Sequence, residues 1–333
     1  MKGNKLRIAL LLCLIASLFA VVVLFLQVDR RQDAAVNGAK KTKFHVEVIL
    51  KSSSGVPEFW QLVKKGVESA ADDWQLSYHV SGPQDERDYE EQIRLVQAAI
   101  HRRPDAIVLA ACDYERLAAI SQRAIDEKIL LITLDSDVNL LGKTSFVGTD
   151  NVALGRELGR LALDTLEPHQ KIAVIGHVKE SATAMERVQG ILENPGIAER
   201  IVDIRYCEGS SELARRQTLQ LLQEYDDIGC FIGLNETSAL GICKALDGRR
   251  RKEKIHVVSC DNAKAQIQYM AAGVIDHFII QNPYQMGYVS IQIAHDALIG
   301  QAVPATTYID SLIIGRDDLR KPEFQKRLFP FIS

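Results

Sequence analysis

Carboxylate and amide side chains follow the ends of four predicted strands. Such groups exchange hydrogen bonds with hydroxyls, and charge-assisted hydrogen bonds are the stronger kind. In open α/β sheets, ligands bind outside the carboxyl ends of the strands. Each residue taken alone could cap a helix or lie in a loop, but together they predict a ligand-binding site. The candidate residues are Asp135, Ser136 and Asp137 after one strand, Asn235 after a second, Asp261 after a third and Gln281 at the end of a fourth.

Two aromatic residues, Phe59 and Trp60, open the first predicted helix of residues 44–333, the main body of the chain. They follow shortly after Pro57. Aromatic faces stack well on apolar ligand faces and bring a large apolar area to a site. The alternative is that both rings belong to the core at the start of the helix. Since Trp is rarely fully buried and adjacent residues do not share one helical stripe, we expect both rings in the ligand site.

Strand and helix signals alternate regularly along the main body. This alternation predicts doubly wound parallel sheets, and its restart near Val152 predicts two α/β lobes of similar fold. Thr149, Asp150 and Asn151 predict the N-cap of the helix at that restart. The predicted strands are 44–50, 76–80, 106–110, 130–134, 146–148, 171–175, 201–206, 229–233, 255–259 and 278–281. The predicted helices are 59–71, 89–101, 117–127, 152–166, 183–192, 212–224, 237–246, 263–272 and 284–299.

The chain is predicted to cross between the two lobes more than once. We expect crossings at residues 148–151 and 281–282, because the last predicted helix returns to the first lobe. The N-terminal lobe then comprises residues 44–150 and 282–308, and the C-terminal lobe comprises 151–281 and 309–333. A chain interleaved in this way makes a hinge from several crossings.

Residues 8–26 contain no charged side chain and follow Lys2, Lys5 and Arg7. At about 1.5 Å per residue, this run can span the hydrocarbon core of a bilayer. Apolar segments of signal peptides are usually shorter, and Ala20 is a poor cleavage site because Leu18 lies before it. We therefore expect a transmembrane anchor at 1–28 and a polar tether at 29–43, with a cleaved signal as the alternative. Whether the segment is an anchor or a cleaved signal, the main body is expected to lie outside the cytoplasm.

Charge is distributed unevenly along the chain. Residues 1–43 carry eight Lys/Arg and two Asp/Glu, a net charge of +6, and the whole chain carries −3, which leaves −9 for the remainder. An acidic main body argues against nucleic acid as a partner. Beyond Cys13 the chain has five cysteines and no C-x-x-C pair, so we expect buried free thiols.

The runs LLITLDSD and TSFVGTDNVALGREL, within 130–158, resemble the periplasmic sugar-binding proteins of bacterial ABC importers, of the ribose-binding type. The resemblance extends from about residue 44 to 317. It implies a type I periplasmic binding fold in which Asp135 and Asp261 hold sugar hydroxyls and Phe59 and Trp60 stack on the ring. The resemblance also assigns Asn235 with Glu236 to the ligand site, and Gln281 to the second crossing.

Two positions depart from the family pattern. Ser136 stands where the family often has Arg, and Asp137 is the candidate to compensate. Met185 stands where the family keeps a sugar-binding Arg, whereas Arg187 falls on a second Arg that is more often structural. Losing a bidentate cation predicts that the ligand is held differently here.

No motif for a nucleotide cofactor or a metal is present, and no enzyme is expected. The eight histidines are scattered, and only His177 falls at a ligand-facing strand end. We expect extracytoplasmic sugar binding with hinge closure, for delivery to an ABC permease. The alternative is a membrane-anchored sensor that signals to a histidine kinase or chemoreceptor. A repressor would need a basic helix-turn-helix where this chain has its apolar run.

Overall fold

The computed structural model describes residues 43–53, 58–247 and 255–328. Contacts divide the chain into two units, Met1–Lys43 and Phe44–Ser333. The predicted anchor and all of the tether except Lys43 lie outside the described residues. Among the residues described, no helix combines the length and the apolar character that crossing a membrane requires.

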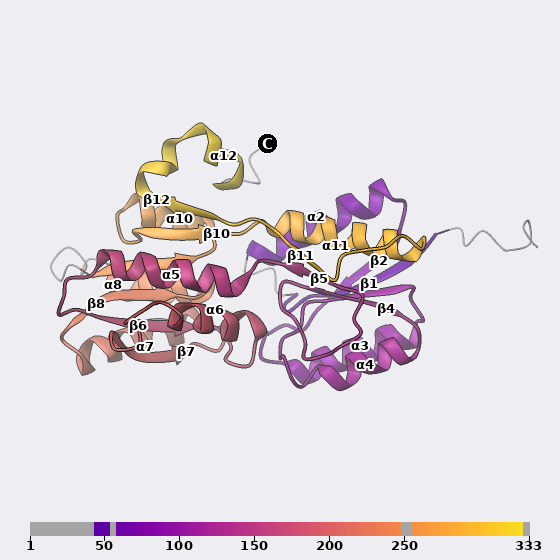
Figure 1. Cartoon of the computed structure of the whole chain (residues 1–333), viewed down its shortest axis with the longest axis horizontal. Helices are drawn as coiled ribbons and strands as arrows, with labels where there is room; N and C mark the ends of the chain where they lie inside the picture. The colour runs from indigo at the N-terminus through magenta and orange to yellow at the C-terminus, as the bar shows by residue number, and fades with distance from the viewer. Residues whose placement is uncertain (1–42, 54–57, 248–254, 329–333) are drawn as a thin grey trace, which may run out of the picture. The chain divides into compact units, whose positions relative to one another are not determined.

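The first of two six-stranded sheets in the described chain has the order β11-β5-β4-β3-β1-β2, with neighbouring strands parallel. Two helices cover one face and two cover the other (Figure 1). Its strands are β1 His45–Ile49, β2 Ser77–Ser81, β3 Ala106–Leu109, β4 Leu130–Leu134, β5 Ser145–Gly148 and β11 Thr306–Tyr308. The covering helices are α2 Glu58–Asp73 with α11 Pro283–Leu298, and α3 Tyr89–His101 with α4 Ala118–Asp126.

The second sheet has the order β12-β10-β9-β8-β6-β7 and is parallel except for the pairing of β12 with β10. Its strands are β6 Lys171–Gly176, β7 Ile201–Tyr206, β8 Ile228–Gly233, β9 His256–Cys260, β10 His277–Ile280 and β12 Leu312–Gly315. One face carries α5 Asn151–Thr165 and α6 Ala182–Leu192, and the other carries α7 Ser211–Glu224, α8 Glu236–Leu246 and α10 Lys264–Ala271. The turn η1 Arg316–Arg320 and helix α12 Pro322–Leu328 follow β12.

The predicted fold class, two α/β lobes with parallel sheets, is confirmed. Predicted element bounds agree with the observed ones to within two residues, and Asp150 caps α5 by accepting a hydrogen bond from the Ala153 amide at 2.9 Å. The sequence predicted no element beyond Ile299, where the structure has β11, β12, η1 and α12. The five cysteines of the described chain are buried and free, as expected. The exact lobe boundaries remain a prediction.

Apart from the edge strands β11 and β12, which run in different directions, the two sheets have the same strand order. Read from the same edge, β4 and β9 both stand third, and β5 and β10 both stand second. Segments that leave equivalent strands therefore occupy equivalent places at the carboxyl edges of the two sheets. The residue directly after β4 is Asp135 and the residue directly after β9 is Asp261.

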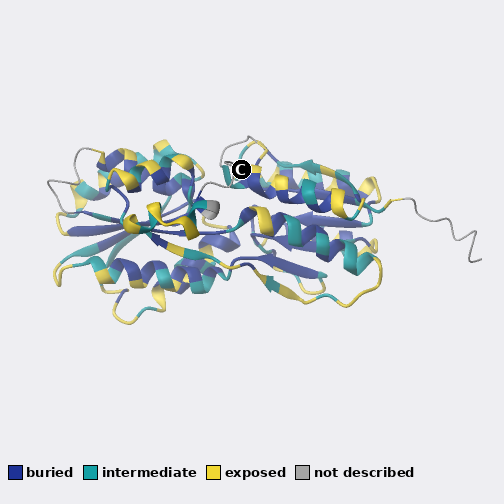
Figure 2. Ribbon diagram, turned by 90° about the horizontal axis from the view of Figure 1, so that it is seen from above, coloured by how far each residue is buried: buried dark blue, intermediate teal, exposed yellow. Residues whose placement is uncertain are grey.

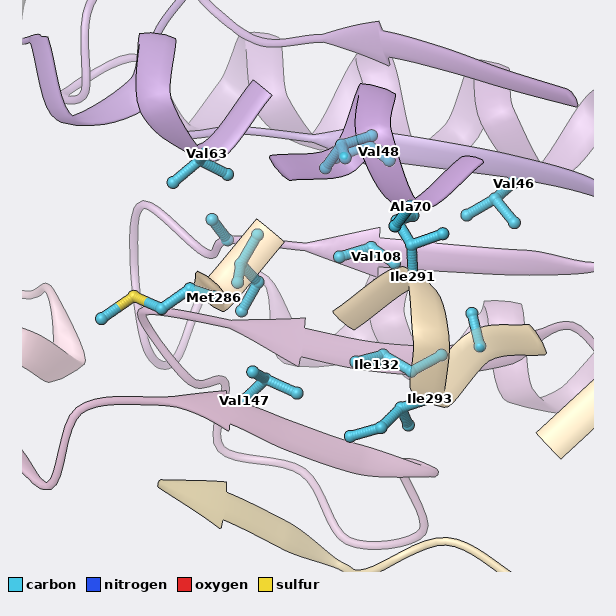
Figure 3. Close-up of a cluster of buried hydrophobic side chains, with 14 of the residues drawn as sticks. Val46, Val48, Val63, Ala70, Val108, Ile132, Val147, Met286, Ile291 and Ile293 are labelled. Carbon is cyan, nitrogen blue, oxygen red and sulfur yellow. The ribbon is translucent and has the colours of Figure 1, made fainter. Parts of the chain in front are cut away.

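Each sheet is buried on both faces between its helices, whose outer surfaces are exposed (Figure 2). Strand residues such as Val48 and Ile132 point toward α2 and α11, where they meet Val63 and Met286 (Figure 3). Burying a side chain of this size stabilises the fold by roughly 1.5–3 kcal/mol. This packing fixes the start of α2, where Phe59 and Trp60 lie.

Two glycines let α2 and α11 approach closely. A Cβ at Gly66 would lie 2.0 Å from the Tyr284 carbonyl oxygen, and one at Gly287 would lie 2.2 Å from that of Val63. Any side chain at either position would push the helices apart. The close packing couples the start of α2 to α11, which begins directly after residues 281–282.

Glu47 is a buried carboxylate in the middle of β1. It accepts hydrogen bonds from Arg102 Nε at 2.6 Å and Nη2 at 2.8 Å, and its oxygens lie 3.1 Å from a ring nitrogen of His45 and 2.9 Å from one of His79. Burial alone would raise the pKa of Glu47, but the hydrogen bonds from Arg102, His79 and His45 outweigh it and lower the pKa to about 2.

We expect Glu47→Gln to lower the free energy of unfolding near neutral pH by about 2 kcal/mol, because a lowered folded-state pKa stabilises the fold above the unfolded value. This contribution is lost as the pH falls from about 4.5, the unfolded value, through about 2. Urea unfolding at several pH values measures it. The difference between variant and wild type should shrink on acidification. Glu68→Gln, at an exposed pair with Lys64, is the control, and an equal loss in both variants would contradict the prediction.

Candidate functional site

Two aspartates hold the same unusual backbone conformation at equivalent strand ends. Asp135 has φ = 61° and Asp261 has φ = 72°, in the left-handed region that non-glycine residues seldom adopt. The Asp135 amide donates to the Val147 carbonyl on β5 at 2.8 Å, and the Asp261 amide donates to the Ile279 carbonyl on β10 at 3.0 Å. Conformations of this kind cluster at functional sites. Both turns bring a carboxylate to the edge of its sheet.

Residues from the two sheets line one small cavity that contains both aspartates. Its volume is about 30 Å³, well below the several hundred Å³ of typical small-molecule pockets. Carboxylates, amides, cations and aromatic rings all face it. The lining residues are Lys51, Phe59, Trp60, Glu86, Asp135, His177, Thr183, Arg187, Asn235, Glu236, Asp261 and Gln281.

A chain of hydrogen bonds joins Asp261 to two of the three segments that pass between the sheets, the one after β5 and the one after β10. Asp261 Oδ1 accepts from Gln281 Nε2 at 2.7 Å, and Gln281 Oε1 accepts from Thr149 Oγ1 at 2.7 Å. Asp261 Oδ2 also accepts from the Glu236 amide at 2.8 Å, at the start of α8. Thr149 directly follows β5 and Gln281 directly follows β10, so the two crossing segments touch at the cavity wall.

Lys51, just beyond β1, is buried and reaches across the cavity. Its Nζ lies 3.4 Å from Asp135 Oδ2 and donates to Ser181 Oγ at 3.1 Å and Thr183 Oγ1 at 3.2 Å. Burial raises the pKa of Asp135, and the attraction of Lys51 and Arg187 only partly offsets it. Lys51 therefore joins the first sheet's carboxylate to hydroxyls of the second lobe.

Arg187 is a second buried cation, 2% exposed, on α6. Its Nε donates to Asn151 Oδ1 at 2.9 Å and its Nη1 donates to the Leu234 carbonyl at 2.5 Å. Since α6 places residues four apart on one face, Thr183 and Arg187 both line the cavity. Met185 lies on another face and is 45% exposed.

His177, just beyond β6, is held uncharged in the cavity wall. Its Nε2 lies 3.0 Å from Thr183 Oγ1, whereas its Nδ1 is buried and has no partner in the described part of the chain. Burial, with Lys51 and Arg187 nearby, lowers the pKa of His177 well below its usual value. The ring thus supplies a hydrogen-bonding nitrogen and no charge.

Phe59 and Trp60 meet edge to face, with ring centroids 5.0 Å apart and planes at 81°. Trp60 is buried in the core beneath α2, and both rings also line the cavity, so a role in ligand binding stays a prediction. Trp60 Nε1 donates to Glu86 Oε1 at 3.0 Å. This bond brings a carboxylate from the loop after β2 beside the aromatic pair.

Six of the eight predicted site residues line the cavity, and Ser136 and Asp137 do not. The backbone reverses at Asp135, where the Ser136 amide donates to the Leu134 carbonyl at 2.6 Å. Asp137 therefore faces away, accepting from Thr133 Oγ1 at 2.8 Å and pairing with Lys143 at 3.0 Å. It lines a separate pocket of about 330 Å³ outside β5. The six that line the cavity are Phe59, Trp60, Asp135, Asn235, Asp261 and Gln281.

Sequence reasoning missed several lining residues. Lys51 follows the first strand. It could have been predicted, as Asp135 was, from the tendency of ligands to bind beyond the carboxyl ends of strands. Arg187 was set aside as structural, although its spacing from Thr183 marks a shared helix face. Glu86 carries no sequence signal, because a loop places it. The site therefore has two cations, where the sequence predicted the loss of one.

The family model for the periplasmic binding protein domain matches residues 46–302. This chain belongs to the periplasmic binding protein family. The family resemblance found in the sequence is thereby confirmed, and the cavity lies where the strand ends of the family's two lobes meet.

Individual relatives of this periplasmic binding protein are distant. A D-ribose/D-allose-binding protein of Pseudomonas aeruginosa is 26% identical over 279 residues, covering 80% of this chain and 86% of that protein. A sugar transporter structure from Clostridium phytofermentans is 29% identical with a TM-score of 0.77, covering 82% of this chain and 99% of that one. A carbohydrate transporter solute-binding protein from Agrobacterium radiobacter, in complex with D-arabinose, is 21% identical with a TM-score of 0.81, covering 87% and 100%. This last likeness concerns the fold.

Proposed function

We propose that this protein binds a small sugar outside the cytoplasm, in the cavity between its two sheets, and delivers it to an ABC importer. The observation that carries the proposal is the pair of left-handed aspartates, Asp135 and Asp261, that face one cavity from equivalent strand ends. A family of solute-binding proteins with sugar-binding relatives supports the same proposal.

The cavity wall offers what a sugar needs. Carboxylate and amide oxygens accept hydrogen bonds from hydroxyls, and those to charged groups are the strongest. The Phe59–Trp60 pair supplies an apolar surface for the C–H face of a ring. Lys51 and Arg187 supply donors for ring and hydroxyl oxygens. These groups are sufficient for a site that binds a sugar and catalyses no reaction.

We propose further that the lobes hinge apart to admit the sugar and close around it. A cavity of about 30 Å³ admits no monosaccharide until the contacts across it part. Those contacts include the bonds from Lys51 to Ser181 and Thr183. The crossing segments at Thr149 and Gln281 are the places where backbone rotation would turn one sheet against the other. A sugar shifts this equilibrium only by binding the closed form more tightly.

A thermal-shift screen of monosaccharides, both neutral and aminated, on the purified full-length protein tests the proposal. A sugar present at 100 times its dissociation constant adds about 2.7 kcal/mol to stability and raises the melting temperature. Small-angle scattering then compares the protein with and without the sugar that binds. We expect a smaller radius of gyration with that sugar and no change with a sugar that does not bind.

No stabilisation by any sugar would contradict sugar binding. Tight sugar binding at an unchanged radius of gyration would contradict the proposed closure but leave the proposed sugar binding intact.

A second function, a membrane-anchored sugar sensor, is favoured by one observation. Residues 8–26 form an uncharged run long enough to span a bilayer, and a protein that stays anchored suits signalling to a kinase or chemoreceptor. Binding and closure would be the same in both functions. Loss of sugar uptake on deletion of the gene favours delivery, whereas loss of a sugar response with uptake intact favours sensing.

A further inference from the structure

The cavity wall carries more carboxyl groups than cations. Lys51 pairs with Asp135 at 3.4 Å, and Arg187 is attracted to Asp261 and Asp135. The two buried cations thus compensate the charges of these two buried carboxylates. Two further carboxylates, Glu86 and Glu236, line the same cavity, and the described residues contain no ion pair between either of them and a basic side chain.

Glu86 and Glu236 come from opposite lobes and act on one another electrostatically. Glu236 is 5% exposed at the start of α8. Burial raises the pKa of Glu236 to about 8, and repulsion by Asp261, Glu58 and Glu86 adds to that rise. Burial also raises the pKa of Glu86, with Lys51 opposing and Asp135 adding to the rise. A positive charge placed beside these two carboxyl groups would lower their pKa values and favour their ionised forms.

Glu86 and Glu236 line the cavity together with the Phe59–Trp60 pair. Trp60 donates its indole N–H to Glu86 Oε1, which leaves the other carboxylate oxygen of Glu86 without a bond from that ring. Aromatic faces attract cations as well as sugar C–H faces, and Trp is the strongest of them. His177 adds an unpartnered buried nitrogen to the same wall without adding positive charge. The aromatic and acidic groups that line this part of the cavity have the chemistry that attracts a cation.

We propose that the sugar bound by this protein carries a protonated amine, with its ammonium group held between Glu86 and Glu236 against the Phe59–Trp60 pair. The inference rests on the proposed sugar binding and narrows its substrate class to aminated monosaccharides. The hydroxyls of the ligand meet Asp135, Asp261 and Asn235, and the ammonium group neutralises the two carboxylates that the protein leaves unpaired. The lining holds four carboxyl groups and two cations, and a neutral sugar would bring no charge to offset this excess.

Matched ligand pairs test this directly. Isothermal titration of the full-length protein near neutral pH compares D-glucosamine with D-glucose and D-galactosamine with D-galactose. In at least one pair we expect the amine to bind roughly tenfold more tightly or better, because charge-assisted hydrogen bonds are about twice as strong as neutral ones. N-acetyl-D-glucosamine keeps the nitrogen and loses the charge, and should lose the advantage.

A variant then assigns the preference to Glu86. Glu86→Gln keeps an oxygen that can accept from Trp60 Nε1 and removes the charge, so the ratio of amine to neutral affinity should fall toward one. Glu90→Gln, an exposed carboxylate on α3, is the matched control and should leave the ratio unchanged. Neutral sugars that bind as tightly as their amines, or a ratio that survives Glu86→Gln, would overturn the inference. Failure of every sugar, neutral or aminated, would instead overturn the proposed function.

Discussion

Asp135→Asn and Asp261→Asn should each weaken sugar binding by roughly 30- to 4000-fold, the two largest losses that we expect from single substitutions. Removing one partner of a buried hydrogen bond to a charged group costs about 2–5 kcal/mol, and about 1.4 kcal/mol corresponds to a factor of ten. Both carboxylates face the cavity from equivalent strand ends. Asn is the suitable replacement because it is nearly isosteric and tolerates the left-handed backbone that both positions adopt.

Asp113→Asn is the matched control for these two variants. Asp113 also follows a strand of the first sheet, but its Oδ1 accepts from the Glu115 and Arg116 amides at 2.9 and 2.8 Å, and it does not line the cavity. Titration calorimetry measures the affinities, and urea unfolding checks that all three variants remain folded. Wild-type affinity in Asp135→Asn and Asp261→Asn, with the fold intact, would remove both residues from the site.

The strand-end residues were predictable because their position depends on strand order alone. Asp135, Asp261 and Gln281 follow apolar runs, and the carboxyl ends of parallel strands meet at one edge of a sheet. The same rule also pointed to Asp137, which does not line the cavity because it lies three residues beyond the end of β4. A single left-handed residue at Asp135 turns the chain, and Thr133 and Lys143 then hold Asp137 on the outside.

Other features depended on contacts that no local pattern encodes. Glu86 lies in a loop and contacts the cavity wall through its hydrogen bond from Trp60, a residue of a different element. The short strands β11 and β12 form by pairing with β5 and β10, which lie far away in the sequence. Strands of three or four residues carry too little periodicity to be found alone. The lobes were therefore predictable from the alternation of elements, whereas their last strands required the folded sheet.

Arg187→Met should lower the free energy of unfolding by roughly 3 kcal/mol or more, since removing one member of a buried charged network leaves the others uncompensated. The guanidinium is 2% exposed and bonds to Asn151 and to the Leu234 carbonyl. Met retains most of the apolar stem, so the loss measures the charged head group. Without that charge, the already raised pKa of Asp135 rises further, because Arg187 is one of the two cations that oppose the effect of burial.

Arg156→Met is the matched control for Arg187→Met, because Arg156 lies on α5 with its side chain 52% exposed and pairs with Glu193 at 2.6 Å. Exposed pairs contribute about 0–1 kcal/mol, so this variant should unfold at nearly the wild-type urea concentration. If Arg187→Met were no less stable than Arg156→Met, the buried guanidinium would not support the fold. A destabilised Arg187→Met that still binds sugar at wild-type affinity would show that Arg187 positions Asn151 and α6 without contacting the ligand. Loss of both stability and affinity is the expected result, because one side chain joins the α5–α6 pair to the wall of the cavity.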